Sequence, residues 1–279
     1  MRKILLTGAT GFIGRNIVPH IRENFNVSTP TRVDLDLLDA YAVRQFLLSG
    51  QFDVVIHLAN PTGHNPKDKE PEIFERSLRV FTSLESCNDL YEKMIYLGSG
   101  AEYGKHRDIS LVSEEELGAA LPKDSYGLSR YIMSKMTQVN KNIINLRLFA
   151  CYGPGDPQHK LIPSIVNDIE KGKDIELNQD VWFDFLYVED IYPVLTHFIE
   201  NSAGFNEYNL CSGQRILISE IANEVKSQMG SSSKIVFRKE GLNHEYTGSI
   251  ERLSKEIPSW KPRKISQGIS KLLKQEKIV

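Results

Sequence analysis

The sequence lacks the features that mark exported, membrane-embedded or metal-binding chains. Its 279 residues include three cysteines, an odd number, so we expect reduced thiols in the core of a cytoplasmic protein. No apolar run approaches the roughly 18 residues of a membrane-spanning helix, and no early apolar segment precedes a cleavage site. Because no pair of cysteines or histidines has ligand spacing, we expect no metal.

The sequence also has little net charge. Lysine and arginine total 34 residues and aspartate and glutamate 36, which leaves a formal charge of -2. This balance gives no reason to expect nucleic acid or a membrane surface as a partner. With 41% hydrophobic residues the chain can bury a substantial core, so we expect one large domain with a smaller second part.

The most informative segment is 3–14, an apolar run followed by three glycines at three-residue spacing. A buried strand that ends at Thr7 would leave Gly8 for a tight turn, Gly11 for close approach of a pyrophosphate, and Gly14 for close packing of the next helix. That helix, from Phe12, would direct its first amide groups at the phosphates. The segment predicts a dinucleotide site formed by Gly8, Thr10, Gly11, Phe12, Ile13 and Gly14.

Strand-like and helix-like segments alternate through about residue 150. Further apolar runs occupy residues 26–29, 53–59, 94–99 and 143–149, and such continuous runs between helices predict a parallel, doubly wound α/β sheet of the Rossmann type. The later chain has helix-like segments at 162–171 and 191–200. We therefore predict a cofactor domain over 1–150, joined by 184–200, and a smaller substrate-binding part over most of 151–279.

The end of the second strand bears on the choice of cofactor. A carboxylate there would bind the ribose 2′-hydroxyl of NAD, whereas a cation accommodates the 2′-phosphate of NADP. The strand is followed by Arg32, and no carboxylate occurs before Asp34. These residues favour NADP, bound through Arg32, with NAD as the alternative.

Six segments occur in an order that resembles the extended short-chain dehydrogenase/reductase family, in its nucleotide-sugar epimerase, dehydratase and reductase branch. They are TGATGFIG at 7–14, LGSGAEYG at 97–104, SYGLSR at 125–130, LRLFACYGPG at 146–155, FDFLYVED at 183–190 and SWKP at 259–262. The resemblance implies NAD or NADP in the first domain and a nucleoside-diphosphate sugar in the second. It also implies a homodimer formed through the helices at 126–139 and from Ser77. Ile132, Met133, Met136 and Val139 of the first helix form an apolar stripe that suits this interface, the alternative being that the stripe packs on the sheet.

The resemblance assigns the catalytic residues. Tyr126 matches the tyrosine whose phenol exchanges a proton with the sugar, and Ser99 matches the residue that hydrogen-bonds the same oxygen. The family has lysine four residues after the tyrosine, where this chain has Arg130. A cation about 5 Å from the phenol is worth roughly two pKa units, and arginine retains that effect with a bulkier, planar group.

A second pair has the literal tyrosine-to-lysine spacing, namely Tyr131 and Lys135. Five residues of helix correspond to a rotation of about 140°, so Tyr131 and Tyr126 cannot face one pocket. The flanking Ser125, Gly127 and Ser129 favour Tyr126. In this interpretation Tyr131 packs and Lys135 is a surface charge.

Other positions carry binding roles by resemblance. Asp36 and Leu37 match residues at the adenine, and Leu58, Ala59 and Asn60 match residues at the nicotinamide ribose. Ser77 replaces a common asparagine of the cofactor site. The predicted substrate contacts are Ser99, Gly100 and Ala101, together with three candidate cations for the diphosphate, Lys160, Arg215 and Arg238.

Absent residues narrow the reaction. Gly100 and Ala101 occupy the positions where 4,6-dehydratases need an acid/base pair, which argues against dehydration. Ala101 and Lys160 occupy the positions where 3,5-epimerase/reductases have cysteine and histidine, which argues against epimerisation at carbon, although His159 is adjacent to the second position. Reduction of a 4-keto nucleotide sugar and 4-epimerisation with bound NAD remain, and the NADP preference favours reduction. A third possibility is a non-catalytic cofactor-sensing module, because Arg130 and Ser77 depart from the family.

Overall fold

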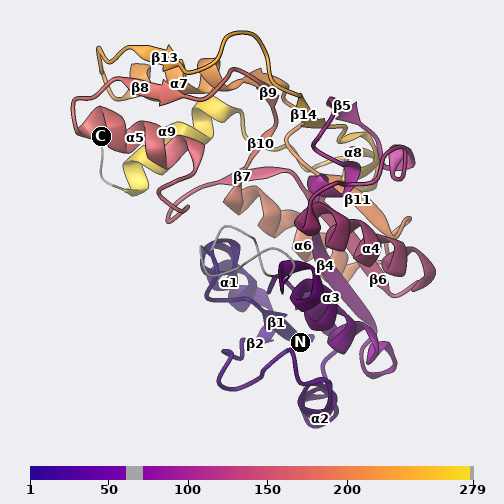
Figure 1. Cartoon of the computed structure of the whole chain (residues 1–279). Helices are drawn as coiled ribbons and strands as arrows, with labels where there is room; N and C mark the ends of the chain where they lie inside the picture. Colours follow the sequence, from indigo (N-terminus) through magenta and orange to yellow (C-terminus); the bar gives the residue numbers. More distant parts are fainter. Residues whose placement is uncertain (61–71, 277–279) are drawn as a thin grey trace.

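The computed structural model describes residues 1–60 and 72–276 and is centred on a six-stranded parallel sheet (Figure 1). The predicted doubly wound α/β fold is confirmed. In spatial order the strands are β11 (Glu207–Leu210), β6 (Ile143–Leu148), β4 (Lys93–Ser99), β3 (Val54–His57), β1 (Lys3–Thr7) and β2 (Asn26–Ser28).

Both faces of this sheet are covered by helices, which explains the continuous apolar strands. In β3, Val54 and Ile56 pack in one layer with α1 (Phe12–Asn24) and α6 (Ile191–Glu200). Val55 packs in the opposite layer, with α2 (Ala40–Gly50), α3 (Glu72–Glu85) and α4 (Ser125–Val139). Successive side chains of a strand point to opposite faces, so a strand covered on both sides is apolar throughout.

A second core lies in the later part of the chain. The helices α5 (Leu161–Glu170), α7 (Ile218–Gln228) and α9 (Ile265–Gln275) pack with the parallel pair β8 (Ile175–Leu177) and β13 (Ile235–Phe237). Figure 1 shows this group at the upper left, apart from α2 and the N-terminal strands. Within the described ranges, no helix is long and apolar enough to cross a membrane.

The two halves of the chain exchange strands. β5 (Ile109–Val112) pairs with β14 (Tyr246–Gly248), in a sheet with β9 (Trp182–Phe183) and β12 (Ile216–Leu217). Conversely, β11 pairs with β6 in the first sheet, and α6 packs on a face of that sheet. A separate two-stranded sheet is formed by β7 (Ala150–Tyr152) and β10 (Phe185–Tyr187). The division at residue 150 stays a prediction. The remaining elements are η1 (Asn88–Leu90), η2 (Gly100–Tyr103), η3 (Glu114–Glu116), η4 (Val188–Asp190) and α8 (Glu251–Glu256).

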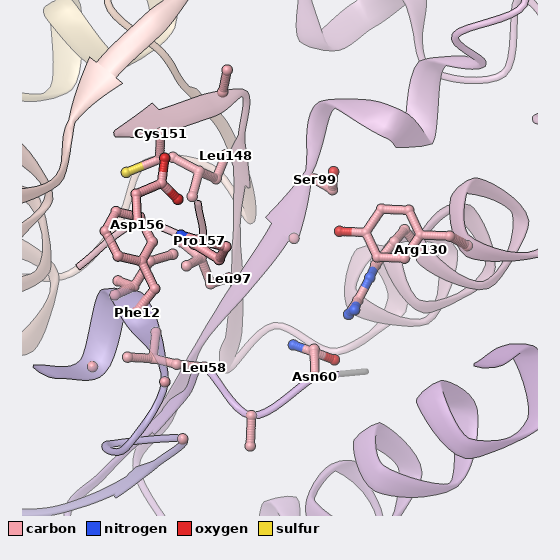
Figure 2. A pocket seen from close by; sticks show the side chains of 18 of the residues that line it. Phe12, Leu58, Asn60, Leu97, Ser99, Arg130, Leu148, Cys151, Asp156 and Pro157 are labelled. Atoms are coloured by element: carbon pink, nitrogen blue, oxygen red, sulfur yellow. The ribbon is translucent and has the colours of Figure 1, made fainter. Parts of the chain in front are cut away.

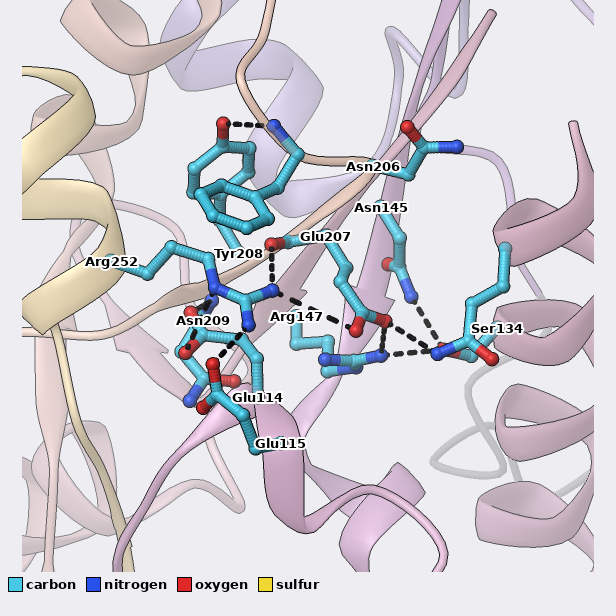
Figure 3. Close-up of polar contacts among 12 residues, drawn as sticks. Glu114, Glu115, Ser134, Asn145, Arg147, Asn206, Glu207, Tyr208, Asn209 and Arg252 are labelled. Atoms are coloured by element: carbon cyan, nitrogen blue, oxygen red, sulfur yellow. Dashed lines mark hydrogen bonds and ion pairs between the residues drawn. The ribbon is translucent and has the colours of Figure 1, made fainter. Parts of the chain in front are cut away.

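Buried charges link these exchanged strands (Figure 3). Arg147 of β6 has no exposed side-chain surface, and its Nε lies 2.6 Å from Glu102 Oε2 while its Nη2 contacts Glu207 of β11. Arg252 of α8 also takes part: its Nη1 lies 3.7 Å from Glu207 Oε1, and its Nε lies 3.7 Å from Glu114 Oε2. Burial favours the neutral form of a carboxyl, and it raises the pKa of Glu102 even though Arg147 opposes the shift.

Candidate functional site

A cavity of about 890 Å³ opens where the strands of the main sheet end. Its lining includes Thr7 of β1, Ser99 of β4 and Leu148 of β6, and each of these is the last residue of its strand. Ligands of open α/β sheets bind at this edge. Figure 2 shows Ser99, Arg130 and Asn60 on one side of the cavity, and Phe12, Cys151 and Asp156 on the other.

The glycine-rich turn is shaped as the sequence predicts. Gly8 has a φ of +80°, and a Cβ built on it would lie 2.6 Å from the backbone nitrogen of Ala59. A Cβ on Gly14 would lie 2.3 Å from the carbonyl oxygen of Gly8. Both positions require glycine, one for its conformation and both for close backbone packing. The turn is therefore a narrow cradle with bare backbone toward the cavity.

Helix α1 begins at this cradle. Its N-cap is Gly11, which has no side chain to bond the first amide groups of the helix. Thr10, Phe12 and Ile13 also line the cavity. Amide groups at a helix start attract phosphate, so the residues here fit the pyrophosphate of a dinucleotide.

Two arginines from different elements are part of the cavity lining. Arg32 is exposed and follows β2, and Arg76 belongs to α3 and was missed by sequence reasoning. Asp34 is engaged by Thr31, whose amide and hydroxyl donate to its Oδ2 at 2.8 and 2.7 Å. Asp36 and Leu37 also line the cavity.

The segment after β3 supplies the next wall. Leu58, Ala59 and Asn60, which match family residues at the nicotinamide ribose, all line the cavity. The Asn60 Oδ1 atom is buried and has no hydrogen-bond partner among residues 1–60 and 72–276. Buried acceptors are normally satisfied, so this oxygen fits a donor on a bound molecule such as the ribose or carboxamide of a nicotinamide nucleotide.

Ser99, Tyr126 and Arg130 all line the cavity, and Ser99 and Arg130 lie on the same side of it (Figure 2). Ser99 is the last residue of β4, and Tyr126 lies in the first turn of α4, which begins after Asp124 accepts a hydrogen bond from the Gly127 amide at 2.7 Å. One turn later, the Arg130 guanidinium carbon lies 4.8 Å from the centroid of the Tyr126 ring. Arg130 is 1% exposed.

The surroundings of Tyr126 favour its ionised form. Burial alone would raise the pKa of this phenol, but the charge of Arg130, a hydrogen bond from Ser99 and the charge of Lys105 together hold that pKa below its ordinary value. Arg130 is itself fixed by a hydrogen bond of 2.9 Å from Nη1 to the Tyr96 hydroxyl. The arrangement can hold and release a proton at the Tyr126 oxygen.

The alternative pair lies elsewhere. Neither Tyr131 nor Lys135 lines the cavity. The Lys135 ammonium lies 5.6 Å from the Tyr131 ring and donates to Gln138 Oε1 at 3.1 Å. The cavity thus contains Tyr126, in agreement with the register favoured from the sequence.

Several predicted contacts do not reach the cavity. Ser77, Gly100 and Ala101 are buried but are not part of its lining. Arg215 pairs with Glu245, both nitrogen–oxygen distances being 2.8 Å, and Arg238 bonds Glu176 at 2.6 Å. Both arginines lie outside the lining, whereas Lys160 is part of it, and burial lowers the pKa of Lys160.

Sequence reasoning missed other residues of the lining, among them Lys105, Tyr246 and Asp156. Lys105, which follows η2, places its ammonium 5.9 Å from the Tyr126 ring and 5.3 Å from the Tyr246 ring. Tyr246 comes from β14, more than a hundred residues from Tyr126 in the sequence, so no local spacing connects them. Asp156 is buried beside the YGPG segment, and burial raises its pKa to about 7. The sequence does point to Asp156, because this residue directly follows the YGPG segment at 152–155.

The comparisons with known proteins agree with this geometry. The profile described as "NAD dependent epimerase/dehydratase family" matches residues 4–211. GDP-L-colitose synthase of Yersinia pseudotuberculosis is 26% identical over 85% of this chain and 85% of its own. CDP-abequose synthase of Salmonella muenchen is 22% identical over 98% of this chain and 97% of its own.

Solved structures share the fold. The GDP-mannoheptose C4 reductase of Campylobacter jejuni, with NADP bound, superimposes with a TM-score of 0.85 at 19% identity. That match covers 99% of this chain and 98% of the reductase.

Proposed function

Because the chain belongs to the NAD dependent epimerase/dehydratase family, we propose that it reduces the 4-keto group of a nucleoside-diphosphate sugar, with NADP as cofactor. The observation that carries the proposal is the meeting of Ser99, Tyr126 and Arg130 in the cavity, with the Tyr126 pKa lowered. This is the constellation that a carbonyl reduction needs, since a positioned acid must protonate the oxygen that becomes a hydroxyl.

Three side chains have separate roles in the proposed reaction. Tyr126 gives its proton to the carbonyl oxygen, Ser99 hydrogen-bonds the same oxygen, and the fixed charge of Arg130 stabilises the phenolate that remains. The nicotinamide, when bound, supplies the hydride. Gly8 and Gly14 shape the cradle for the pyrophosphate, and Asn60 provides a buried acceptor beside it.

The choice of NADP rests on cations of the cavity lining. Arg32, which follows β2, and Arg76 of α3 are both part of the lining, and Asp34 is already bonded by Thr31. Two arginines suit a 2′-phosphate, because the guanidinium fork pairs with phosphate oxygens. NAD remains the alternative cofactor.

The sugar end supports reduction over dehydration. Gly100 and Ala101 carry no acid or base, and Glu102 is bonded to Arg147 and to the Ser99 amide rather than directed into the cavity. The wall there is formed by aromatic and aliphatic side chains, and Lys160 is a cation for the diphosphate. This wall comprises Phe149, Val181, Phe183, Phe185, Ile218 and Tyr246.

The test is turnover with a panel of nucleotide sugars and both cofactors. The sugars of GDP, CDP, UDP and dTDP, each in its 4-keto and its 4-hydroxy form, should be incubated with both cofactors, with absorbance at 340 nm and product stereochemistry as readouts. Consumption of one NADPH per 4-hydroxy product supports the proposal. Interconversion of 4-epimers without net consumption would assign the epimerase alternative, and cofactor binding without turnover on any sugar would assign the sensing module.

A further inference from the structure

Glu102 is a buried carboxyl directly behind the wall of the cavity. Its side chain has no exposed surface. Gly98 belongs to the cavity lining, and a Cβ built on Gly98 would overlap the Glu102 Oε1 atom. A buried carboxyl is unfavourable unless it is paired and hydrogen-bonded, so its partners show what it does for the fold.

The two oxygens of Glu102 bind different strands. Oε1 accepts the backbone amide of Ser99 at 2.9 Å, and Oε2 accepts the Arg147 Nε at 2.6 Å. Asn145 adds a hydrogen bond of 3.1 Å from its Nδ2 to Oε2. All of these partners are donors, which suits an ionised carboxylate. One oxygen therefore holds the end of β4, and the other is fixed to β6.

The hydroxyl of Ser99 is fixed in the same turn. Ser99 precedes η2, and its Oγ accepts the Ala101 amide at 3.2 Å while the Glu102 side chain accepts the Ser99 amide. These reciprocal bonds form a capping box, which fixes the backbone of Ser99 together with its side chain. A serine hydroxyl has one hydrogen and two lone pairs, so Ser99 still has its hydrogen to donate.

The partners of Glu102 also bind helix α4, which carries the phenol of the proposed reaction (Figure 3). Arg147 donates from Nη2 to the Ser134 hydroxyl oxygen at 2.8 Å, and Asn145 donates to the same oxygen at 3.1 Å. Ser134 lies one helical turn after Arg130. The contacts of Glu102 thus connect the end of β4 to α4 through buried side chains.

We propose that Glu102 is a positioning residue, whose carboxylate fixes Ser99 at the end of β4 and, through Arg147, ties that end to α4. The inference rests on the proposed function in taking Ser99 as the group that hydrogen-bonds the reacting oxygen. Ser99 and Tyr126 come from different elements, so their spacing depends on how these elements are joined. A misplacement of about 1 Å can lower a rate on the order of a hundredfold.

Glu114 is a matched carboxyl of the same charge network. It is buried, lies 3.7 Å from Arg252 and accepts the Asn209 amide at 2.7 Å. Asn209 belongs to β11 and is not part of the cavity lining. Glu102 and Glu114 therefore differ in the strand that each one holds, and only Glu102 should affect Ser99.

The decisive variant is Glu102→Met, which keeps the length of the side chain and removes both acceptor oxygens. Arg147 retains Glu207 as a partner, so no buried charge is left alone. Amide hydrogen exchange is measured by NMR on the full-length, ¹⁵N-labelled chain, and the Ser99 signal is identified by serine labelling and its loss in Ser99→Ala. Relative to the other amides of β4, the Ser99 amide should exchange on the order of tenfold faster, because it has lost a charged acceptor.

Glu114→Met is the control for loss of a buried carboxyl. A merely structural role would lower the protection of all β4 amides alike, as Glu114→Met should do if it changes them. A Ser99 amide that keeps its relative exchange rate in Glu102→Met, or that Glu114→Met accelerates as much, would overturn the proposal.

The parent chain gives an independent test should Glu102→Met fail to fold. Its Ser99 amide should be protected as strongly as the interior amides of β4, since it bonds a buried carboxylate. Exchange at the rate of an exposed amide would refute the inference.

Kinetics separate positioning from substrate binding. With a sugar that the parent turns over, Glu102→Met should lower kcat on the order of tenfold or more and leave KM unchanged, because Ser99 bonds the reacting oxygen rather than the nucleotide. An unchanged kcat would refute the positioning role. A parent that turns over no nucleotide sugar would fail the proposed function, whereas the exchange rates would still decide whether Glu102 holds Ser99.

Discussion

Arg130 illustrates how one departure from a family pattern can preserve chemistry. Its guanidinium is nearly fully buried, stacks on the Tyr126 ring and is fixed by the Tyr96 hydroxyl. A guanidinium keeps its proton at every pH that a protein tolerates, whereas a lysine in this environment could lose it. The phenol is therefore next to a constant positive charge.

Tyr126→Phe tests the proton-transferring phenol. The variant should bind NADPH as the parent does and should lower turnover by at least about a hundredfold, because it removes the general acid. Steady-state kinetics and cofactor titration by fluorescence measure the two effects. Tyr131→Phe is the control, and a collapse of activity there, with Tyr126→Phe near normal, would show that the alternative register is the working one.

Arg32→Ala tests the cofactor preference. Loss of a charge-assisted bond to the 2′-phosphate should weaken NADPH by about 1.5–3 kcal/mol and leave NADH nearly unchanged. Calorimetric titration with both cofactors gives the difference. Arg22→Ala removes an exposed arginine that bonds Thr29 outside the cavity and should change neither affinity. Equal losses of both cofactors in Arg32→Ala would contradict the preference.

Individual site residues differed in how far the sequence could locate them. Ser99 and Tyr126 were found because motifs place one at a strand end and the other at a helix start, which the sheet brings together. Arg215 and Arg238 were named for their charge alone, and each is paired with a nearby carboxylate. Lys105 and Tyr246 were missed because tertiary packing, rather than spacing, brings them to the cavity.

Helix α4 positions Arg130 beside Tyr126, the phenol of the proposed proton transfer, since residues four apart share one face. Replacing Arg130 should therefore act through the pKa of Tyr126. Arg130→Met removes the charge that lowers this pKa, so the tyrosine limb of the pH–rate profile should move to higher pH and the rate should fall. Arg130→Lys should retain activity or raise it. Identical profiles for Arg130→Met and the parent would exclude a catalytic role for this position.

The same helix bears on oligomeric state. The sequence predicted an apolar stripe of Ile132, Met133, Met136 and Val139, but Met133 is fully buried in the core, so the predicted stripe is not one surface. Ile132 and Leu128 are half-buried and Val139 is 80% exposed on the outer face.

We propose that this outer face of α4, with α3, forms a homodimer. Sedimentation at micromolar concentration should give twice the chain mass of 31.7 kDa. Ile132→Glu should give the single mass, because a charge in an apolar interface is unfavourable. Lys135→Glu, on the same exposed face, is the control for charge alone, and a monomeric parent would contradict the dimer.

The strands of the main sheet were predicted to within a few residues, with one exception. β11 was missed because Glu207 and Asn209 interrupt its apolar character. In the structure the Asn209 side chain donates to the Val112 carbonyl at 2.8 Å and accepts from the Tyr103 hydroxyl at 2.8 Å, while Glu207 pairs with Arg147. A strand whose polar groups are satisfied by distant partners carries no local apolar signal.

Stability as a function of pH should reflect Asp156, a buried carboxyl of the cavity. Its pKa is raised from 3.8 to about 7, mainly by burial. A folded-state pKa above the unfolded value means that its contribution is fully present below about pH 4 and is lost as the pH rises through 7. The change is roughly 4 kcal/mol at most.

Asp156→Asn checks this assignment. The variant cannot ionise, so relative to the parent it should gain thermal stability between pH 4 and 8, with melting temperatures measured by calorimetry. Asp174→Asn, at an exposed position, is the control. A difference between Asp156→Asn and the parent that does not vary with pH would show that Asp156 titrates normally.

The exchange of strands between the halves has a consequence for how the protein is made. Synthesis proceeds from the N-terminus, so β6 leaves the ribosome before β11, and until residue 210 emerges one long edge of the sheet lacks its neighbour. During that interval Arg147 has Glu102 but not Glu207 beside it. An apolar strand with open backbone groups is prone to pair with other chains. A nascent chain stalled near residue 150 should therefore need a chaperone, and residues 1–150 should not be separable as an independent product.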